Sequence, residues 1–198
     1  MIEINEKKEE FRNSLFFNNA WRDSVQHGKK GTSIYSEFVN SESSKIESRD
    51  QLRKIIETEY IEKIYLKHSV TEEEHYTNIS ELHKTILTMK NTKNEFTLFS
   101  EDFNIGRVQK LLNMLLKYYW SCGVMEYEPC HMPIDSIIIK SLTKDSTTKE
   151  QKEKLKVNWT EIATIDEYKR IIQVAKEIVK AKNYESLTAY ELVNWSSQ

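Results

Sequence analysis

The stretch that decides the fold is Gly106-Arg-Val-Gln-Lys-Leu-Leu-Asn-Met-Leu-Leu-Lys-Tyr-Tyr-Trp120. At the α-helical angle of about 100° per residue, its apolar residues gather on one broad face. That face comprises Gly106, Val108, Leu111, Leu112, Leu115, Tyr119 and Cys122. A polar stripe lies opposite and comprises Lys110, Asn113, Lys117 and Trp120. The pattern predicts a central helix whose polar stripe is either solvated surface or part of a functional cleft.

The composition around this helix favours further helices. The chain of 198 residues has four glycines and two prolines, too few for the many tight turns of a sandwich or barrel. We therefore expect an all-α fold, one domain over 1–198, with little or no strand. A Ser/Thr-rich charged stretch near 143–156 is typical of a mobile connection, although its Glu/Lys end could also form a helix.

Other helices are indicated by apolar spacing and by capping residues. We expect helices over 5–26 and 49–66, where apolar residues recur at helical spacing. The segments Thr71-Glu-Glu-Glu74 and Thr164-Ile-Asp-Glu167 have the form of capping boxes and predict two more helix starts. Phe96-Thr-Leu-Phe99 fits either an extended piece or a helix entry.

Charge and hydropathy bear on the compartment and the partners. No window approaches 18 apolar residues, and the first ten residues are charged, so we expect a cytoplasmic protein without a membrane span. Its two cysteines should then be reduced thiols, not a disulfide. The formal charge of −2 gives no global attraction to nucleic acid, although a local basic face is compatible with it.

Lys110 and Asp135 are the residues most suggestive of chemistry. Lys110 is placed by the pattern in the first turn of the central helix, where the helix dipole disfavours an ammonium and so favours a nucleophilic amine. Pro133 suits the first position of the next helix, which would put Asp135 in its first turn. Asp135 is then either a helix-end acid or a catalytic carboxylate.

The pattern Gly-x-x-x-Lys-x-Leu-Asn-x-x-Leu-Lys-Tyr-x-Trp, followed by Pro-Cys-His-x-Pro-Ile-Asp, resembles the core of an uncharacterised family of small helical microbial proteins. That resemblance is silent on mechanism.

The same segment also resembles the helix-hairpin-helix DNA glycosylases. Gly106, Lys110 and Pro133-Ile-Asp135 stand in the order of that family's hairpin glycine, lysine and Pro-x-Asp motif. Val108 stands where the family usually has a second glycine. The resemblance implies DNA as the partner: hairpin amides hold a phosphate, a damaged base is flipped out, Lys110 forms a Schiff base with the sugar, and Asp135 assists.

The same resemblance implies a set of nucleic-acid contacts. The residues expected to contact DNA are Gly106, Asn113, Lys117, Trp120 and His131, with Lys117, Lys140 and Lys144 contributing to a positive rim.

Metal chemistry is not expected from the sequence. The Cys-x7-Cys-His spacing of Cys122, Cys130 and His131 does not match the short cysteine pairs of structural zinc sites. We therefore expect a buried thiol, a loop histidine, and neither a metal nor another cofactor. His75 and His83 lack the i, i+4 spacing of a helical metal site and are expected on a solvated face.

A second function fits the same sequence, namely a non-enzymatic helical interaction module that binds a protein partner. That alternative predicts an exposed apolar patch and no salt-sensitive DNA binding. The glycosylase hypothesis instead requires Lys110 and Asp135 to share one site. The sequence leaves the oligomeric state open.

Overall fold

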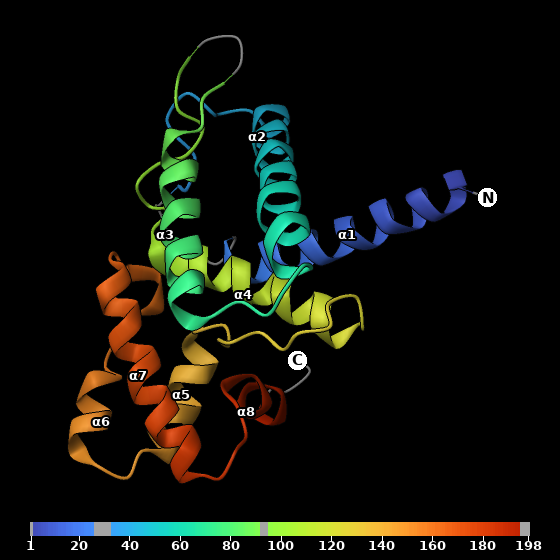
Figure 1. The fold of residues 1–198 in the computed structure, drawn as a ribbon. Coiled ribbons are helices and arrows are strands. Elements are labelled where there is room, and N and C mark those ends of the chain that lie inside the picture. Colours follow the sequence, from blue (N-terminus) through green and yellow to red (C-terminus); the bar gives the residue numbers. More distant parts are fainter. Residues whose placement is uncertain (1, 26–32, 92–94, 195–198) are drawn as a thin grey trace.

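The computed structural model describes residues 2–25, 33–91 and 95–194, and its regular elements there are helices. Figure 1 shows them in chain order: α1 (Ile2–Ser24), α2 (Glu42–Ile55), the π-helix η1 (Ile56–Tyr65), α3 (Glu72–Thr88), α4 (Ile105–Ser121), α5 (Ser136–Asp145), α6 (Lys149–Lys154), the 3-10 turn η2 (Trp159–Glu161), α7 (Ile165–Ala181) and α8 (Leu187–Asn194). Two isolated antiparallel bridges, Tyr35 with Phe99 and Lys90 with Thr97, are the extended pairings among these residues. The all-α prediction is confirmed, and Phe96–Phe99 is extended.

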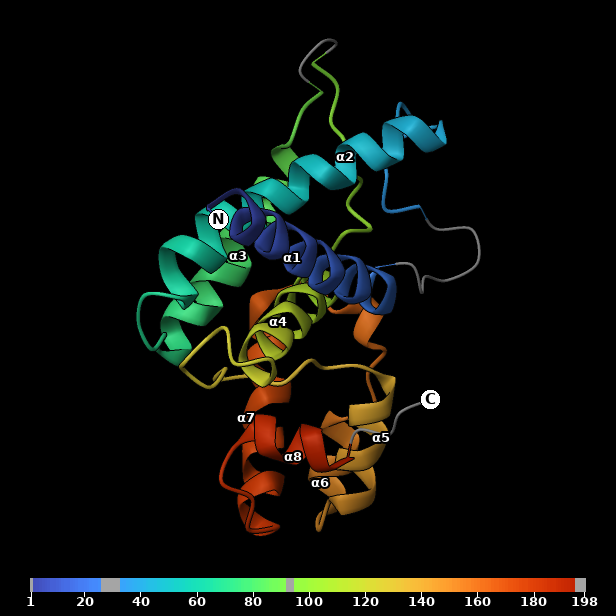
Figure 2. The ribbon, with the colours of Figure 1, turned by 90° about the vertical axis from the view of Figure 1, so that its right-hand side faces the viewer.

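Helix α4 lies at the centre of the molecule. It packs against α1, α3, η2 and α7. Figures 1 and 2 show α2 and α3 on one side of it and the group α5–α8 on the other. Every residue of α4 from Ile105 to Lys117 is buried, polar ones included. The predicted central helix is therefore confirmed, but both of its faces are covered.

Both predicted capping boxes are present. The Glu74 amide donates to Thr71 Oγ1 at 3.3 Å, and the Glu74 carboxylate accepts from the Thr71 amide at 2.8 Å. Thr164 and Glu167 repeat this exchange at the start of α7. Each box satisfies amides that the first helical turn leaves without partners.

One helix start differs from its prediction. The helix expected to begin at residue 49 begins at Glu42, because Ser41 and Ser44 form a capping box with a serine in place of the usual acid. It continues into η1, where Leu66 N donates to Ile61 O, five residues back. The stretch near 143–156, predicted as a mobile connection whose Glu/Lys end could form a helix, holds the end of α5 and helix α6, which Thr148 caps.

Helix α1 extends beyond the rest of the molecule at its N-terminal end (Figure 1). Its later residues Phe17, Ala20 and Trp21 are buried in the core, whereas Ile4, Phe11 and Leu15 are exposed. None of the helices in the described part of the chain is long and apolar enough to cross a membrane.

Candidate active site where helices α4 and α5 meet

Lys110 and Asp135 are in direct contact. Lys110 Nζ lies 3.1 Å from Asp135 Oδ2, and the two side chains are 9% and 18% exposed. Lys110 is the sixth residue of α4, because the helix begins at Ile105 behind the cap Asn104, so its predicted place in the first turn is wrong. The pair is therefore formed and largely covered.

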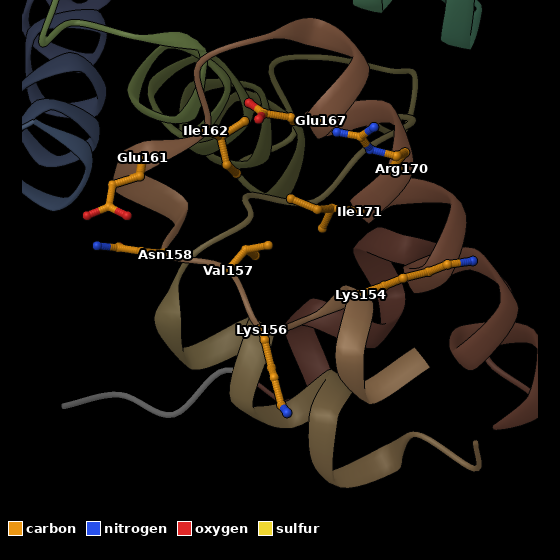
Figure 3. A pocket seen from close by; sticks show the side chains of 9 residues that line it. All are labelled: Lys154, Lys156, Val157, Asn158, Glu161, Ile162, Glu167, Arg170 and Ile171. Carbon is orange, nitrogen blue, oxygen red and sulfur yellow. The ribbon is translucent and has the colours of Figure 1, made fainter. Parts of the chain in front are cut away.

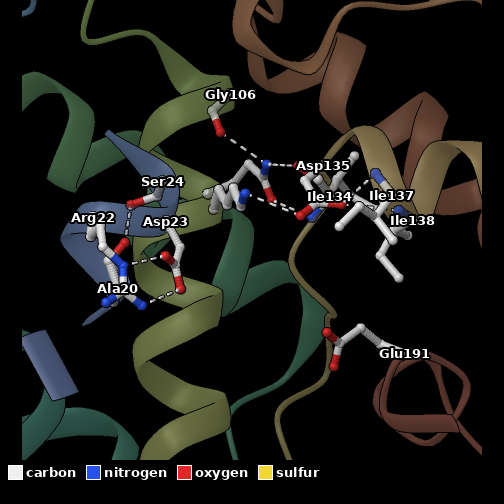
Figure 4. A network of polar contacts seen from close by, with 12 residues as sticks. Ala20, Arg22, Asp23, Ser24, Gly106, Ile134, Asp135, Ile137, Ile138 and Glu191 are labelled. Atoms are coloured by element: carbon white, nitrogen blue, oxygen red, sulfur yellow. Dashed lines mark hydrogen bonds and ion pairs between the residues drawn. The ribbon is translucent and has the colours of Figure 1, made fainter. Parts of the chain in front are cut away.

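Asp135 is the N-cap of α5, one position before the first turn in which it was predicted. Its Oδ1 accepts from the amides of Ile137 and Ile138, each at 2.9 Å (Figure 4). Oδ2 is left to face Lys110. The helix-end role and the contact with lysine thus use different oxygens of one carboxylate.

Gln109 holds the segment before Asp135 against α4. Its Oε1 accepts from the Ile134 amide at 3.1 Å, and its Nε2 donates to the Ile134 carbonyl at 2.8 Å. Gln109 is fully buried. This two-way amide contact fixes the residue next to Asp135 and so sets where the carboxylate lies relative to Lys110.

Trp159 covers the lysine. Its ring centroid lies 4.7 Å from Lys110 Nζ, within cation–π range. Gly106 makes this approach of η2 possible: a Cβ at Gly106 would lie 1.9 Å from the Trp159 carbonyl oxygen. The Gly106 amide donates to the Ile162 carbonyl at 2.9 Å. The amide that was expected to hold a DNA phosphate therefore already binds the protein's own backbone.

A second ion pair lies on the same side of α4. Lys117 Nζ is 2.8 Å from Glu191 Oε1, and these side chains are 8% and 5% exposed. Burial raises the pKa of Glu191, against the opposing effect of Lys117. Among the described residues, Glu191 Oε2 has no hydrogen-bond partner. Figure 4 shows Glu191 on α8 with its carboxylate directed toward α4.

The polar stripe of α4 is not solvated surface. Asn113 is fully buried, where its Oδ1 faces His75 Nε2 at 2.9 Å and its Nδ2 donates to Tyr168 Oη at 3.0 Å. Lys117 is paired with Glu191, and Trp120 is partly buried against the core. The stripe is covered because α7 and α8 supply partners for it.

His131 was expected to contact DNA but is 1% exposed. Its Nδ1 lies 3.1 Å from Tyr168 Oη, and its Nε2 lies 3.4 Å from Glu72 Oε1. His75, expected on a solvated face, is fully buried and lies beside His131. Sequence spacing did not reveal this, because α3 and the loop before α5 are brought together only by folding.

The two cysteines are free and lie in different surroundings. Cys122, expected as a buried thiol on the central helix, is instead exposed, because it lies just past the end of α4, whereas Cys130 is half-buried. The ligand atoms of His75, Cys130 and His131 lie within 4.8 Å of one another. Among the residues that the structure describes, this group, and not the trio with Cys122, could hold a metal ion.

A surface cavity of about 360 Å³ lies between η2 and the start of α7 (Figure 3). Its lining carries the cationic side chains of Lys154, Lys156 and Arg170. Glu161 and Glu167 also line it, but the Glu167 carboxylate accepts the amides of Ala163 and Thr164. Asn158 and Ile162 of its lining flank η2, the turn that carries Trp159.

The chain matched no protein-family model, no curated protein and no solved structure in the comparisons.

Proposed function

We propose that this protein acts on DNA as a helix-hairpin-helix glycosylase-like enzyme, with Lys110 as the nucleophile and Asp135 as its carboxylate partner. One observation carries the proposal. Two residues singled out by the sequence as a catalytic pair, on separate helices, lie with Nζ and Oδ2 3.1 Å apart. Nucleophile and base within hydrogen-bond reach are what amine catalysis requires.

The surroundings of Asp135 suit a proton acceptor of fixed position. Two backbone amides hold Oδ1, and Gln109 holds the preceding residue, so Oδ2 faces Lys110 without needing to reorient. In the proposed reaction Oδ2 accepts the proton that the Lys110 nitrogen gives up as it attacks the sugar, and the fixed carboxylate is already in hydrogen-bond reach of that nitrogen.

The chemistry that follows is base excision. The Lys110 amine attacks C1′ of the deoxyribose, the bond from C1′ to the base nitrogen breaks, and the base leaves with that electron pair and takes up a proton. The nitrogen then gives up a second proton and the C1′–O4′ bond breaks, with O4′ leaving with that electron pair and taking up the proton, which gives an open-chain Schiff base between Lys110 and the sugar. Water then hydrolyses the Schiff base.

Access to Lys110 is through Trp159. The lysine side chain is 9% exposed, and the Trp159 ring covers its amine. In this proposal Trp159 swings aside, and a flipped-out nucleotide enters from the side of the cavity next to η2. Lys154 and Arg170 of the cavity lining then bind the DNA backbone, in place of the Gly106 amide. Exposed Lys140 and Lys144 on α5 add to the positive rim.

The test is borohydride trapping with the full-length chain. Duplexes that carry a single damaged base or an abasic site are incubated with the protein and borohydride, which reduces a Schiff base to a stable amine. We expect a covalent complex that Lys110→Ala abolishes and that Asp135→Asn slows by roughly 100-fold or more. Lys180→Ala is the control, since Lys180 is exposed on α7.

DNA affinity is measured beside the trapping. If three phosphates are contacted, affinity should fall roughly 40-fold between 50 and 200 mM salt. Circular dichroism of each variant separates loss of chemistry from loss of fold. Absence of both a trapped complex and salt-sensitive binding on every duplex would overturn the proposal.

A second candidate function is favoured by one specific observation on α1. Ile4, Phe11 and Leu15 are 60%, 66% and 45% exposed. Their spacing of seven and then four residues places them on one helical face, as in a helix that packs against another helix. In this alternative the chain is a non-enzymatic interaction module that pairs through α1 with a second helix.

If the partner helix belongs to a second copy of this chain, sedimentation equilibrium distinguishes the interaction module from the glycosylase. The interaction module predicts a dimer that Phe11→Ser with Leu15→Ser converts to a monomer, and no trapped DNA complex. A wild-type protein that stays monomeric at high concentration would contradict pairing between copies.

A further inference from the structure

His75 on α3 and the adjacent Cys130 and His131 before α5 form a cluster that the proposed DNA chemistry does not use. Their three ligand atoms lie within 4.8 Å of one another. Zinc is a borderline-soft cation, and imidazole nitrogens and thiolates are the ligands that it prefers in proteins. In a tetrahedral zinc site such atoms are about 3.5 Å apart, so closure requires a movement of about an ångström.

The hydrogen bonds around His75 determine which of its nitrogens is available. Asn113 Nδ2 donates a hydrogen bond to Tyr168 Oη, which leaves the Oδ1 atom of Asn113 facing His75 Nε2 at 2.9 Å. Because that oxygen only accepts, Nε2 carries the proton. His75 Nδ1 therefore has a free electron pair, which now lies 2.7 Å from Tyr65 Oη.

His131 is arranged in the same way. Its Nε2 lies 3.4 Å from the Glu72 carboxylate, which accepts a hydrogen bond from the Nε2 N–H group. The Tyr168 hydroxyl accepts from Asn113 and so points its own hydrogen at His131 Nδ1, 3.1 Å away. In both histidines Nδ1 therefore carries the free electron pair, while the Nε2 N–H group donates a hydrogen bond to an oxygen atom. Oxygen acceptors in this position orient the histidine ligands of metal sites.

The Cys130 sulfur completes the group, since it lies within 4.8 Å of a ring nitrogen of each histidine. Burial lowers the pKa of His75 and of His131, so both rings are neutral near pH 7. Burial raises the pKa of the Cys130 thiol to about 12, and a bound cation would reverse that by displacing the thiol proton.

We propose that His75, Cys130 and His131 bind one zinc ion through the two Nδ1 atoms and the thiolate, with water in the fourth position. Binding turns the Tyr65 and Tyr168 hydroxyls away from the two nitrogens and releases the thiol proton to solvent. The half-buried Cys130 gives the ion its entry from the surface. The zinc ties the loop before α5, which carries Asp135, to α3.

The test uses the full-length protein after treatment with a chelator. Titration with cobalt(II) is expected to give one equivalent of binding, with thiolate-to-metal charge transfer and the visible absorption of tetrahedral cobalt. Zinc should displace the cobalt and raise the thermal midpoint. Absence of the thiolate band, or binding well below one equivalent, would overturn the proposal.

The two cysteines provide a matched pair of variants. Cys130→Ser should lose the thiolate band and at least 100-fold in affinity, whereas Cys122→Ser should bind as the wild type does. Glu72→Gln, which removes a partner of His131 but no ligand, should weaken binding by about 10- to 100-fold. Cys130→Ser binding with wild-type affinity would also overturn the assignment. A thiol reagent gives a readout free of folding effects, because zinc should protect Cys130 and leave Cys122 reactive.

Discussion

Lys110 Nζ contacts Asp135 Oδ2 at 3.1 Å while Asp135 Oδ1 accepts the amides of Ile137 and Ile138. One carboxylate therefore starts helix α5 and neutralises a covered lysine of helix α4. Changes to Asp135 should separate these two roles.

Asp135→Asn should destabilise the protein less than Asp135→Ala. Asparagine caps helices as well as aspartate does, so it loses only the charge opposite Lys110, whereas alanine loses the cap as well. We expect a reduction of about 3 kcal/mol in the free energy of unfolding for Asn and about 1 kcal/mol more for Ala. Urea denaturation measures both. Equal stability of the two variants would mean that the cap contributes nothing.

Gly106→Ala should destabilise the packing of η2 on α4. The added methyl would meet the Trp159 carbonyl at 1.9 Å, and backbone cannot move aside as a flexible side chain can. We expect a loss of about 3 kcal/mol. Gly123→Ala is the comparison, because Gly123 has open space but a φ of +70°, and should lose only about 1 kcal/mol. Thermal unfolding that ranks the two in the opposite order would contradict the steric argument.

Lys117→Met alone should lower the free energy of unfolding more than Lys117→Met combined with Glu191→Leu. Removing one partner leaves a buried charge unpaired, at about 3–5 kcal/mol, whereas two apolar side chains of similar volume restore most of that loss. A double-mutant cycle from denaturation curves measures the coupling. Additive effects of the two changes would show that the ion pair at 2.8 Å does not act as a unit.

Stability should fall as the pH is lowered from 7.5 to 5.5. Burial holds the pKa of His75 and of His131 below 6.5 in the folded state, so the unfolded chain binds more protons in this range. Two such groups give a slope of up to about 2.7 kcal/mol per pH unit, and half-buried His83 adds to it in the same direction. Denaturation by urea at several pH values measures the slope.

His131→Asn should reduce that slope, because it removes one of the two buried histidines. Glu72 acts in a lower range. Its hydrogen bond with His131 lowers the pKa of the Glu72 carboxyl, so its stabilising effect is lost only as the pH falls below about 4.5. A slope between pH 5.5 and 7.5 that survives His131→Asn unchanged would contradict the assignment.

Trp159→Ala should make Lys110 more reactive toward small reagents. The ring centroid lies 4.7 Å from the Lys110 amine, so its removal uncovers that side of the amine. Mass spectrometry after reductive methylation should show faster modification of Lys110 than in the wild type, with exposed Lys180 as the internal reference. The substitution should also lose about 3–5 kcal/mol of stability, so Trp159→Phe serves as the milder change with an intermediate rate.

The sequence by itself determined the features that depend on near neighbours. Apolar spacing indicated the helix from Gly106, and the Thr71 and Thr164 boxes located two helix starts, because capping is complete within four residues. It also named Lys110 and Asp135 as a pair to examine. It missed the start at Ser41, whose capping partner is a serine and not an acid.

Only the tertiary structure decided what covers the polar face of α4. Asn113 meets Tyr168 from 55 residues away, and Lys117 meets Glu191 from 74 residues away. A helical projection shows that such residues share a face but cannot show whether water or another helix lies over it. Desolvated polar groups persist there because distant partners satisfy them. For this reason the polar stripe of α4, which the sequence allowed to be solvated surface, is a buried hydrogen-bond network in the folded protein. Lys110 likewise lies beneath Trp159.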